Sequence, residues 1–231
     1  MPSIGTATIQ YVDNPQGLDS LVEACRNAKT IALDTEFERS TTYFARPALL
    51  QFRTGDQIWL LDPIAVSELD QLGSALNASS PLKILHSASE DLAVLELATG
   101  HPIQGLFDTQ LAAAFAGHGF TLGYHALANH LLGVTVNKDQ TRSNWLQRPL
   151  TQAQLAYAAA DVEHLHVMYH RLSEEVHALG RSDWLEEETK TLITRATTND
   201  IERDFIRLAG RVDDNDARGR LRAICQQREN L

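Results

Sequence analysis

The sequence contains only two cysteines, no long hydrophobic run and no surplus of positive charge. Cys25 and Cys225 lie far apart and form no CxxC pattern, so neither a disulfide framework nor a thiolate zinc site is indicated. No run approaches the roughly 20 apolar residues that a membrane helix needs, and the first residues lack the basic and apolar regions of a signal peptide. We therefore expect a soluble, cytoplasmic protein with no membrane contact.

The charge balance is negative, with 20 Lys and Arg residues against 30 Asp and Glu residues and a formal net charge of -10. This is the wrong sign for a protein that coats nucleic acid by neutralising its phosphates. It is compatible with an enzyme that gathers carboxylates around divalent cations, because the bound cations then present positive charge to the phosphate.

The hydrophobic pattern predicts an α/β fold. Strands are expected at 8–12, 30–37, 48–53, 58–61 and 82–85, and helices at 14–28, 67–77, 89–99, 108–115, 124–132 and 151–179. Antiparallel strands followed by alternating helices and strands are typical of a mixed sheet with helices on its faces. We expect residues 1–180 to form this domain. Residues 181–231 are expected to form a helical extension or the beginning of a C-terminal helical domain.

The strand at 30–37 ends in the sequence DTEF, which places Asp34 and Glu36 two residues apart. Successive side chains of a strand point to opposite faces, so these two carboxylates leave the same face of the sheet. Two hard oxygen ligands then lie side by side. The acids of a lone DxE motif are more often only exposed to solvent at a strand end. The motif therefore indicates a metal site only in combination with the two motifs described next.

Two further acidic motifs lie on predicted helices. In LHSASEDL, a strand runs into a helix whose first turn carries Glu90 and Asp91, where acids complement the helix dipole. Ser89 is the expected N-cap, which leaves Asp91 as the better ligand candidate. In YAAAD, Tyr157 and Asp161 are four residues apart and share one helix face, with small alanines between them. Each of these motifs by itself also fits an ordinary helix with a solvated face.

Together the three segments resemble the exonuclease motifs of the DEDD superfamily, in the variant that has Tyr in the third motif. DTEF, LHSASEDL and YAAADVEHL occur in the family's order, and residues 107–110 and 137–150 resemble further segments of the ribonuclease D family. The resemblance runs from about Thr30 to Leu172 and more faintly to the C-terminus. It implies a ribonuclease H-like mixed sheet flanked by helices, with a C-terminal helical extension.

The resemblance places the family's metal ligands on Asp34, Glu36, Asp91 and Asp161, with Tyr157 beside the attacking water. Carboxylates that are crowded together repel one another and tend to protonate unless divalent cations favour their charged forms. Ligation by oxygen alone suits two Mg²⁺ or Mn²⁺ ions, which can activate water and stabilise the leaving 3′ oxygen. We therefore expect these five residues to form a catalytic site that needs two divalent metal ions.

The resemblance implies a metal-dependent 3′ to 5′ exoribonuclease that releases 5′-nucleoside monophosphates by a two-metal mechanism. The expected partner is RNA with a single-stranded 3′ end, and the family points to the maturation of tRNA precursors and other small RNAs. A DNA-directed 3′ to 5′ exonuclease is an alternative, because the same acids serve both substrates. A catalytically inactive nucleic-acid-binding module is another alternative, since a fold does not fix a function. The sequence indicates no oligomeric state.

Four residues are candidates for substrate binding, namely Phe37, Lys138, Arg142 and Trp145, and Arg148 is a further candidate for a phosphate contact. Phe37 follows the DTE motif and can stack on a terminal base, although a buried core Phe fits the pattern equally well. Lys138 and Arg142 flank Trp145 in a polar loop, as does Arg148, and these cations are candidates for phosphate contacts. The alternative is a solvated loop in which Trp145 is the hydrophobic anchor.

Overall fold

The structure is a computed structural model that describes residues 7–39, 42, 44–136, 140, 143–197, 205, 209–210 and 214–228. Two of the predicted substrate-binding residues, Lys138 and Arg142, lie outside these ranges. Among the helices that are described, none combines the length and the apolar character that crossing a membrane requires.

In the described residues, six strands form one mixed sheet in the order β1-β4-β3-β2-β5-β6. The strands are β1 (Thr8–Val12), β2 (Thr30–Glu38), β3 (Arg46–Thr54), β4 (Gln57–Leu61), β5 (Leu82–Leu85) and β6 (Leu106–Asp108). β2, β5 and β6 run parallel to one another, β3 runs antiparallel to β2 and β4, and β1 runs parallel to β4. The predicted α/β fold with a mixed sheet is confirmed.

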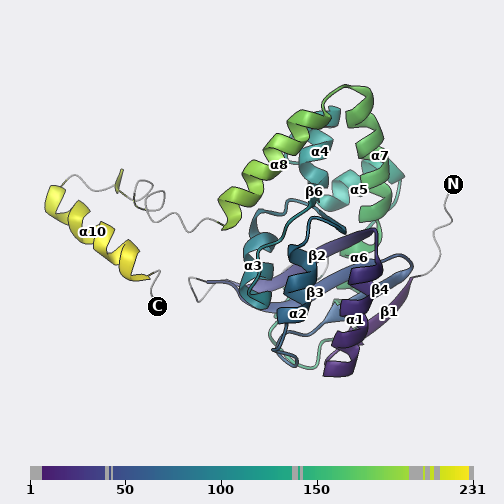
Figure 1. The fold of residues 1–231 in the computed structure, drawn as a ribbon, viewed down its shortest axis with the longest axis horizontal. Coiled ribbons are helices and arrows are strands. Elements are labelled where there is room, and N and C mark those ends of the chain that lie inside the picture. The colour runs from purple at the N-terminus through teal and green to yellow at the C-terminus, as the bar shows by residue number, and fades with distance from the viewer. Residues whose placement is uncertain are drawn as a thin grey trace.

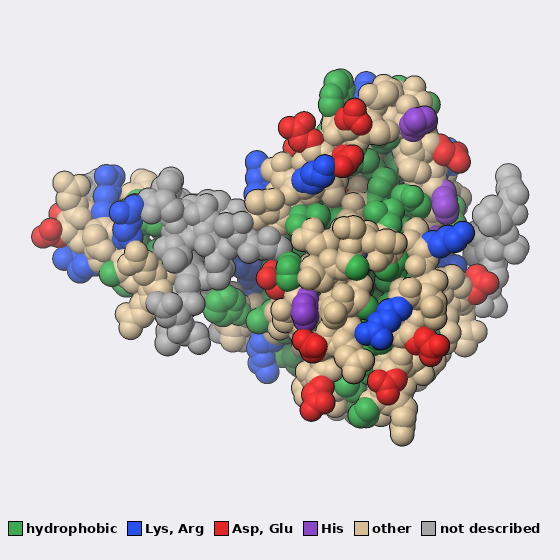
Figure 2. All heavy atoms as spheres, viewed as in Figure 1, with side chains coloured by type: hydrophobic (Ala, Val, Ile, Leu, Met, Phe, Trp, Pro, Cys, Tyr) green, Lys and Arg blue, Asp and Glu red, His purple; other side chains and the backbone are tan. Residues whose placement is uncertain are grey.

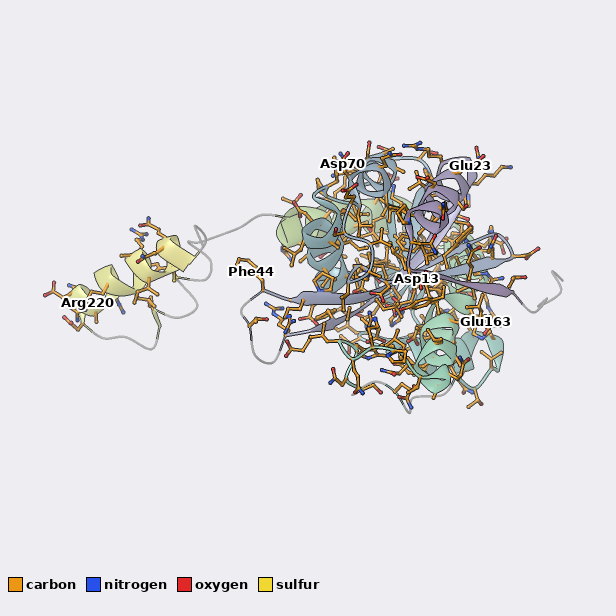
Figure 3. All side chains as sticks on the ribbon, turned by 90° about the horizontal axis from the view of Figure 1, so that it is seen from below. Asp13, Glu23, Phe44, Asp70, Glu163 and Arg220 are labelled. Atoms are coloured by element: carbon orange, nitrogen blue, oxygen red, sulfur yellow. The ribbon has the colours of Figure 1, made fainter. Side chains whose placement is uncertain are left out.

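Helices cover both faces of the sheet (Figure 1), and the view turned by 90° shows the strands between the two helical layers (Figure 3). The first layer consists of α1 (Pro15–Asn27), α2 (Asp70–Asn77) and α3 (Ser89–Thr99). The second consists of α4 (Thr109–Ala116), α5 (Tyr124–Leu132), α6 (Gln152–Glu163) and α7 (Leu165–Ala178). The chain continues into α8 (Ser182–Thr197) and α10 (Asn215–Arg228).

Each helical layer packs on its own hydrophobic core. On the side of α1 to α3 the core includes Leu21, Phe52 and Leu95, and on the side of α4 to α7 it includes Leu127 and Met168. The central strands therefore bury side chains on both faces. This is why β3 and β4 have nearly continuous apolar sequences instead of a strict alternation with polar residues.

One prediction about the helices is wrong, because the expected single helix at 151–179 is two helices, α6 and α7, that meet at His164. In an unbroken helix, the His164 N–H would donate to the carbonyl of Ala160. Instead it donates to the hydroxyl of Tyr124 at 3.3 Å, and this hydroxyl donates to the Ala160 carbonyl at 2.7 Å. A side chain inserted into the hydrogen-bond ladder is a known cause of helix breaks, and nothing in the local sequence announces it.

Helix α8 packs against α3, α4 and α7, and its Leu185 and Thr189 are buried. The packed unit therefore continues beyond residue 181, whereas Figure 1 shows α10 apart from the sheet. A pocket of about 470 Å³ lies between α7, α8 and the first residues of β5 and β6. Figure 2 shows hydrophobic side chains gathered in this region, below α7 and α8.

Arg148 has a structural role in this fold. Its Nε and Nη2 donate to the carboxylate of Asp62 at 2.5 and 2.9 Å, and Nη2 also donates to the Ala48 carbonyl at 2.5 Å. The hydroxyl of Tyr11 donates to the same carboxylate at 2.6 Å. Burial by itself raises the pKa of Asp62, but the hydrogen bonds from Arg148 and Tyr11 outweigh it and the pKa is lowered. The guanidinium is thus already bound to protein, which argues against Arg148 as a phosphate contact.

We expect Asp62→Asn to lower the free energy of unfolding by about 2 to 4 kcal/mol, because it leaves the partly buried Arg148 without its counter-charge. Urea denaturation followed by circular dichroism would measure this change. Lys190→Ala, which breaks the exposed pair with Glu186 on α8, is the matched control and should change the stability much less. Equal effects of the two substitutions would contradict the anchoring role of Arg148.

Candidate active site

Asp34 and Glu36 lie on β2, the strand at the centre of the sheet that is bordered by β3 and β5. Their side chains alternate with those of Leu33 and Thr35, so the two acids share one face of the sheet, as the DTEF spacing predicts, and that face is the one covered by α6. The register with β3 shifts between Glu36 and Phe37, directly after the acids, and the pairing continues beyond it through Phe37 and Glu38. The strand therefore fixes both carboxylates at one place beneath α6.

Tyr157 and Asp161 come from α6, which lies across β2, β3 and β4. The helix begins with a capping box in which the Thr151 side chain accepts from the Gln154 N–H and the Gln154 side chain accepts from the Thr151 N–H. The small buried side chain of Ala158 lets the helix approach the sheet closely. The spacing of four residues then directs the phenol and the carboxylate toward the acids of β2, and all four side chains line one pocket of about 180 Å³.

Three carboxylates meet in this pocket. One oxygen atom from each of Asp34, Glu36 and Asp161 lies within 4.8 Å of the others. Among the residues that the structure describes, these three form the only group of three or more potential metal-ligating side chains that lie close enough to share a cation. The donor set consists of carboxylate oxygen alone, which suits hard divalent cations such as Mg²⁺ or Mn²⁺.

The environment of these carboxylates disfavours their charged forms. Burial raises the pKa of Asp34 well above its ordinary value, and the charges of Asp91, Asp161 and Glu36 raise it further. Burial, followed by the charges of Asp161 and Asp91, raises the pKa of Glu36 to about 9. Burial also raises the pKa of Asp161 to about 7, against an opposing hydrogen bond with Tyr157. A bound cation reverses this tendency, so the chemistry of the residues fits a metal site.

Asp91 reaches the site from the other side of the sheet. It lies in the first turn of α3, where the hydroxyl of Thr35 donates to its carboxylate at 2.5 Å. Burial raises the pKa of Asp91 to about 6, and the Thr35 hydrogen bond opposes the shift. Its neighbour Glu90 is exposed and pairs with Arg39 at 3.1 Å. Asp91 is not among the residues that line the pocket or among the three grouped carboxylates, but its charge acts on Asp34 and Glu36, and that of Glu90 is not among the causes of their raised pKa values.

The expected N-cap of α3 is wrong. The helix begins at Ser89 itself, and the residue at the cap position is Ala88, whose side chain cannot accept a hydrogen bond. The carboxylate of Asp108 instead accepts from the N–H groups of Ser87 and Ala88, at 3.1 and 2.8 Å. These two N–H groups lie at and before the cap position, so Asp108 holds the segment that leads into α3, while it also caps α4 by accepting from the N–H groups of Gln110 and Leu111.

Three residues that the sequence did not single out also line the pocket, namely His86, Tyr124 and His125. Both ring nitrogens of His86 are engaged, with the Thr109 hydroxyl at 2.9 Å and the Leu122 carbonyl at 3.0 Å. The Nε2 atom of His125 lies 3.9 Å from a carboxylate oxygen of Asp161. His86 belongs to the LHSASEDL motif, so the sequence offers a signal that could have identified it. Tyr124 and His125 belong to an otherwise unremarked helix, and no sequence signal marks them.

The predicted substrate-binding residues differ in their surroundings. Phe37 is half-buried and lines a second pocket of about 310 Å³ together with Arg39, Phe44 and Leu97. Trp145 is only 4% exposed and packs in the core on the side of α6, with its ring 6.0 Å from that of Tyr157. The structure favours the anchoring role of Trp145 over a direct contact with substrate.

Comparison with known proteins identifies the family. The model of a family described as 3′-5′ exonuclease matches residues 9–177, which include all four acids and Tyr157. The chain belongs to the 3′-5′ exonuclease family. Among its curated relatives, ribonuclease D of Shewanella sp. is 37% identical over 203 residues, which are 87% of this chain and 52% of the relative. The resemblance to ribonuclease D in the sequence is thereby confirmed.

Solved structures with a similar fold agree with this assignment. Escherichia coli RNase D, described as an exoribonuclease involved in structured RNA processing, superposes with a TM-score of 0.81 at 36% identity. The match covers 87% of this chain and 54% of that one. Brucella melitensis NrnC bound to pGG gives a TM-score of 0.72 at 29% identity and covers 82% of this chain and 92% of that one. The chain thus spans about half the length of the ribonuclease D relatives that it matches.

We expect the metal-free protein to lose stability as the pH rises. A carboxyl group whose pKa is higher in the folded protein holds its proton more tightly there, so folding is favoured at low pH and disfavoured once the group ionises. The loss should extend from the ordinary carboxyl pKa of about 4 through the raised pKa values of about 6, 7 and 9 for Asp91, Asp161 and Glu36. Urea denaturation in EDTA between pH 5 and pH 8 would measure it.

Two controls separate this effect from the general titration of the protein. Replacing both Asp34 and Asp161 by Asn should flatten the pH dependence in EDTA, whereas Glu23→Gln on the exposed face of α1 should leave it unchanged. Saturating Mn²⁺ should restore the stability of the wild type at pH 8 but not that of the double variant. A pH dependence that is the same in all three proteins would show that the acid cluster is not its source.

Proposed function

We propose that this chain is a metal-dependent 3′ to 5′ exoribonuclease of the ribonuclease D type. The observation that carries the proposal is the meeting of Asp34, Glu36 and Asp161 in one pocket of a chain of the 3′-5′ exonuclease family. RNA with a single-stranded 3′ end is the proposed substrate, and 5′-nucleoside monophosphates are the proposed products. Relatives named ribonuclease D support RNA over DNA, and precursors of tRNA and other small RNAs are the natural candidates.

The four acids are the proposed ligands of two divalent cations, Mg²⁺ or Mn²⁺. Asp34 interacts with the charges of the other three acids, which supports it as the ligand shared by both ions. Glu36 and Asp161 would hold the ion beside Tyr157, and Asp91 would complete the second position from the side of α3. When bound, such ions lower the pKa of a water molecule and stabilise the leaving 3′ oxygen.

Tyr157 is proposed to orient the attacking water. A phenol with a pKa near 10 is a poor base at neutral pH, so the group contributes by position and not by removing a proton. Its hydrogen bond with Asp161 and its place in the wall of the pocket support this role. The packing of its ring near the buried Trp145 restricts the directions in which the hydroxyl can point.

Substrate binding and domain boundaries remain part of the proposal. Phe37 stays a candidate for stacking on a base, because it lines a pocket on the side of α3 that also contains Phe44. Lys138 and Arg142 stay candidates for phosphate contacts.

The proposed nuclease domain at residues 1–180 is supported by the family match to residues 9–177. Residues 181–231 are the proposed helical extension, whose first helix, α8, packs on the domain.

A second candidate is the hydrolysis of very short oligonucleotides. The observation that favours it is the match to 92% of the length of Brucella melitensis NrnC in its complex with pGG. A pocket of about 180 Å³ beside the acids accommodates only the end of a chain, so a dinucleotide and a longer RNA present the same group to the acids. Substrate length is therefore the property that separates the two candidates.

We expect the wild type, with Mg²⁺ or Mn²⁺, to shorten a 5′-labelled RNA with a single-stranded 3′ tail from its 3′ end, and EDTA to abolish the reaction. Asp34→Asn should reduce the rate by roughly a thousandfold or more, as loss of one member of a catalytic unit does. Asp19→Asn on α1, away from the pocket, is the matched control. A ladder of products on gels would measure both rates.

The same assay distinguishes the alternatives. Faster cutting of a DNA strand of matching sequence would replace RNA by DNA as the substrate. Rapid cleavage of pGG with slow cleavage of the long RNA would favour the short-oligonucleotide function. Binding of RNA without cutting under either metal would identify a module without nuclease activity.

We expect Tyr157→Phe to lower kcat by about a hundredfold, since a misplaced reactant costs roughly that much, while the affinity for metal stays unchanged. Single-turnover kinetics would measure the rate, and calorimetric titration with Mn²⁺ would measure the affinity. Full activity in Tyr157→Phe would contradict the orienting role, and a large loss of Mn²⁺ affinity would indicate that the phenol supports the ligands instead.

A further inference from the structure

Phe120 has the most exposed large hydrophobic side chain in the described part of the chain, at 82%. It lies in the loop between α4 and α5, which comprises residues 117–123 and is called here the α4–α5 loop. The loop already has a hydrophobic anchor, because Leu122 packs against the core on the side of α6. Isolated exposed apolar residues are common on protein surfaces, so the exposure of Phe120 gains meaning only from its surroundings.

The backbone on both sides of Phe120 is held in an unusual conformation. Gly119 has a φ of 123° and Thr121 a φ of 62°, both in the left-handed region. A β-branched residue such as Thr rarely adopts this conformation, because its side chain crowds the backbone. Backbone strain of this kind persists only where the surrounding structure enforces it, and it is concentrated at active sites and ligand clamps.

Hydrogen bonds tie the α4–α5 loop to the wall of the catalytic pocket. The carbonyl of Leu122 accepts from Nε2 of His86 and from the side-chain nitrogen of Gln110, each at 3.0 Å. His86 lines the same pocket as Asp34. Two residues of chain span at most about 7 Å, so Phe120 lies close to the edge of that pocket. Its exposed side chain is thus available to a strand whose 3′ end enters that pocket.

The charge of the protein makes stacking a suitable way to hold RNA here. The chain has a net charge of -10, which limits phosphate neutralisation. Two arginines are already paired within the protein, Arg39 with Glu90 and Arg148 with Asp62. An aromatic ring stacks on any base without regard to sequence, and such stacking does not depend on phosphate charge.

We propose that Phe120 stacks on a nucleobase of the RNA strand, upstream of the 3′-terminal nucleotide that enters the pocket of Asp34. The proposal rests on the proposed exonuclease function and adds a contact outside the catalytic pocket. It also gives a reason for the left-handed Thr121, since this conformation supports a loop whose anchor, Leu122, points inward while Phe120 points outward.

Binding measurements test the contact without cleavage. In an Asp34→Asn background with Mg²⁺, we would measure the affinity for single-stranded oligoribonucleotides that carry 2-aminopurine at successive positions from the 3′ end. Phe120→Ala should weaken binding by about fivefold to tenfold, at the lower end of base stacking on an aromatic ring, and Phe120→Trp should retain it. One 2-aminopurine position should be quenched on binding, and this quenching should disappear in Phe120→Ala.

The matched control is Leu179→Ala, which removes another exposed apolar side chain, 49% exposed, from the turn after α7. The affinity of Leu179→Ala for the oligoribonucleotide should equal that of the Asp34→Asn parent protein. In active enzyme, Phe120→Ala should raise KM by a similar factor with kcat changed less than twofold. An abasic nucleotide at the quenched position should make Phe120→Ala and the parent bind equally.

Two results would overturn the proposal. The first is an unchanged affinity and an unchanged 2-aminopurine signal in Phe120→Ala. The second is a loss of affinity that persists with an abasic nucleotide at every position, which would indicate a structural effect on the loop. If the proposed function is wrong, the wild type will cut no RNA in the cleavage assay. The binding experiment is independent of that result, so it still tests the role of Phe120.

Discussion

The carboxylates of Asp34, Glu36 and Asp161 repel one another, and the surrounding structure holds them together against that repulsion. Burial strengthens the repulsion, because a low-dielectric environment screens the charges less than water does. Burial is also the largest cause of the raised pKa values, which reach about 9 for Glu36, where the charges of Asp161 and Asp91 add to it, and about 7 for Asp161. Cations bound at this cluster would favour the charged carboxylates and would stabilise the folded protein by binding to it.

The sheet and the helices on its two faces hold these acids in place. The centre of the sheet supplies Asp34 and Glu36, and α6 supplies Asp161 from the layer above them. The opposite helical layer contributes Asp91, held by Thr35 at 2.5 Å. Because Thr35 and Asp34 are neighbours on opposite faces of one strand, the site joins both hydrophobic cores of the domain. Displacement of either layer would change the distances among the acids.

The sequence predicts those parts of the site that depend on local geometry. Alternation along a strand aligns Asp34 with Glu36, and helical spacing aligns Tyr157 with Asp161, so short stretches of sequence are sufficient. Features that depend on contacts between distant segments were not predictable in this way. The presence of His125 in the pocket is one such feature. The sequence also does not decide between burial and exposure of Trp145. Which residues of a loop contact the core depends on segments that are distant in the sequence.

The hydroxyl of Tyr124 stands between the Ala160 carbonyl and the His164 N–H, at the boundary of α6 and α7. Without that hydroxyl, as in Tyr124→Phe, the carbonyl and the N–H would be free to bond directly, and one continuous helix would become favourable. In the folded protein this hydroxyl therefore separates two helices that the local sequence would join. The packing of α7 on α4 and α5 holds the second helix in its place, so one buried tyrosine and the neighbouring helices together define where α6 ends.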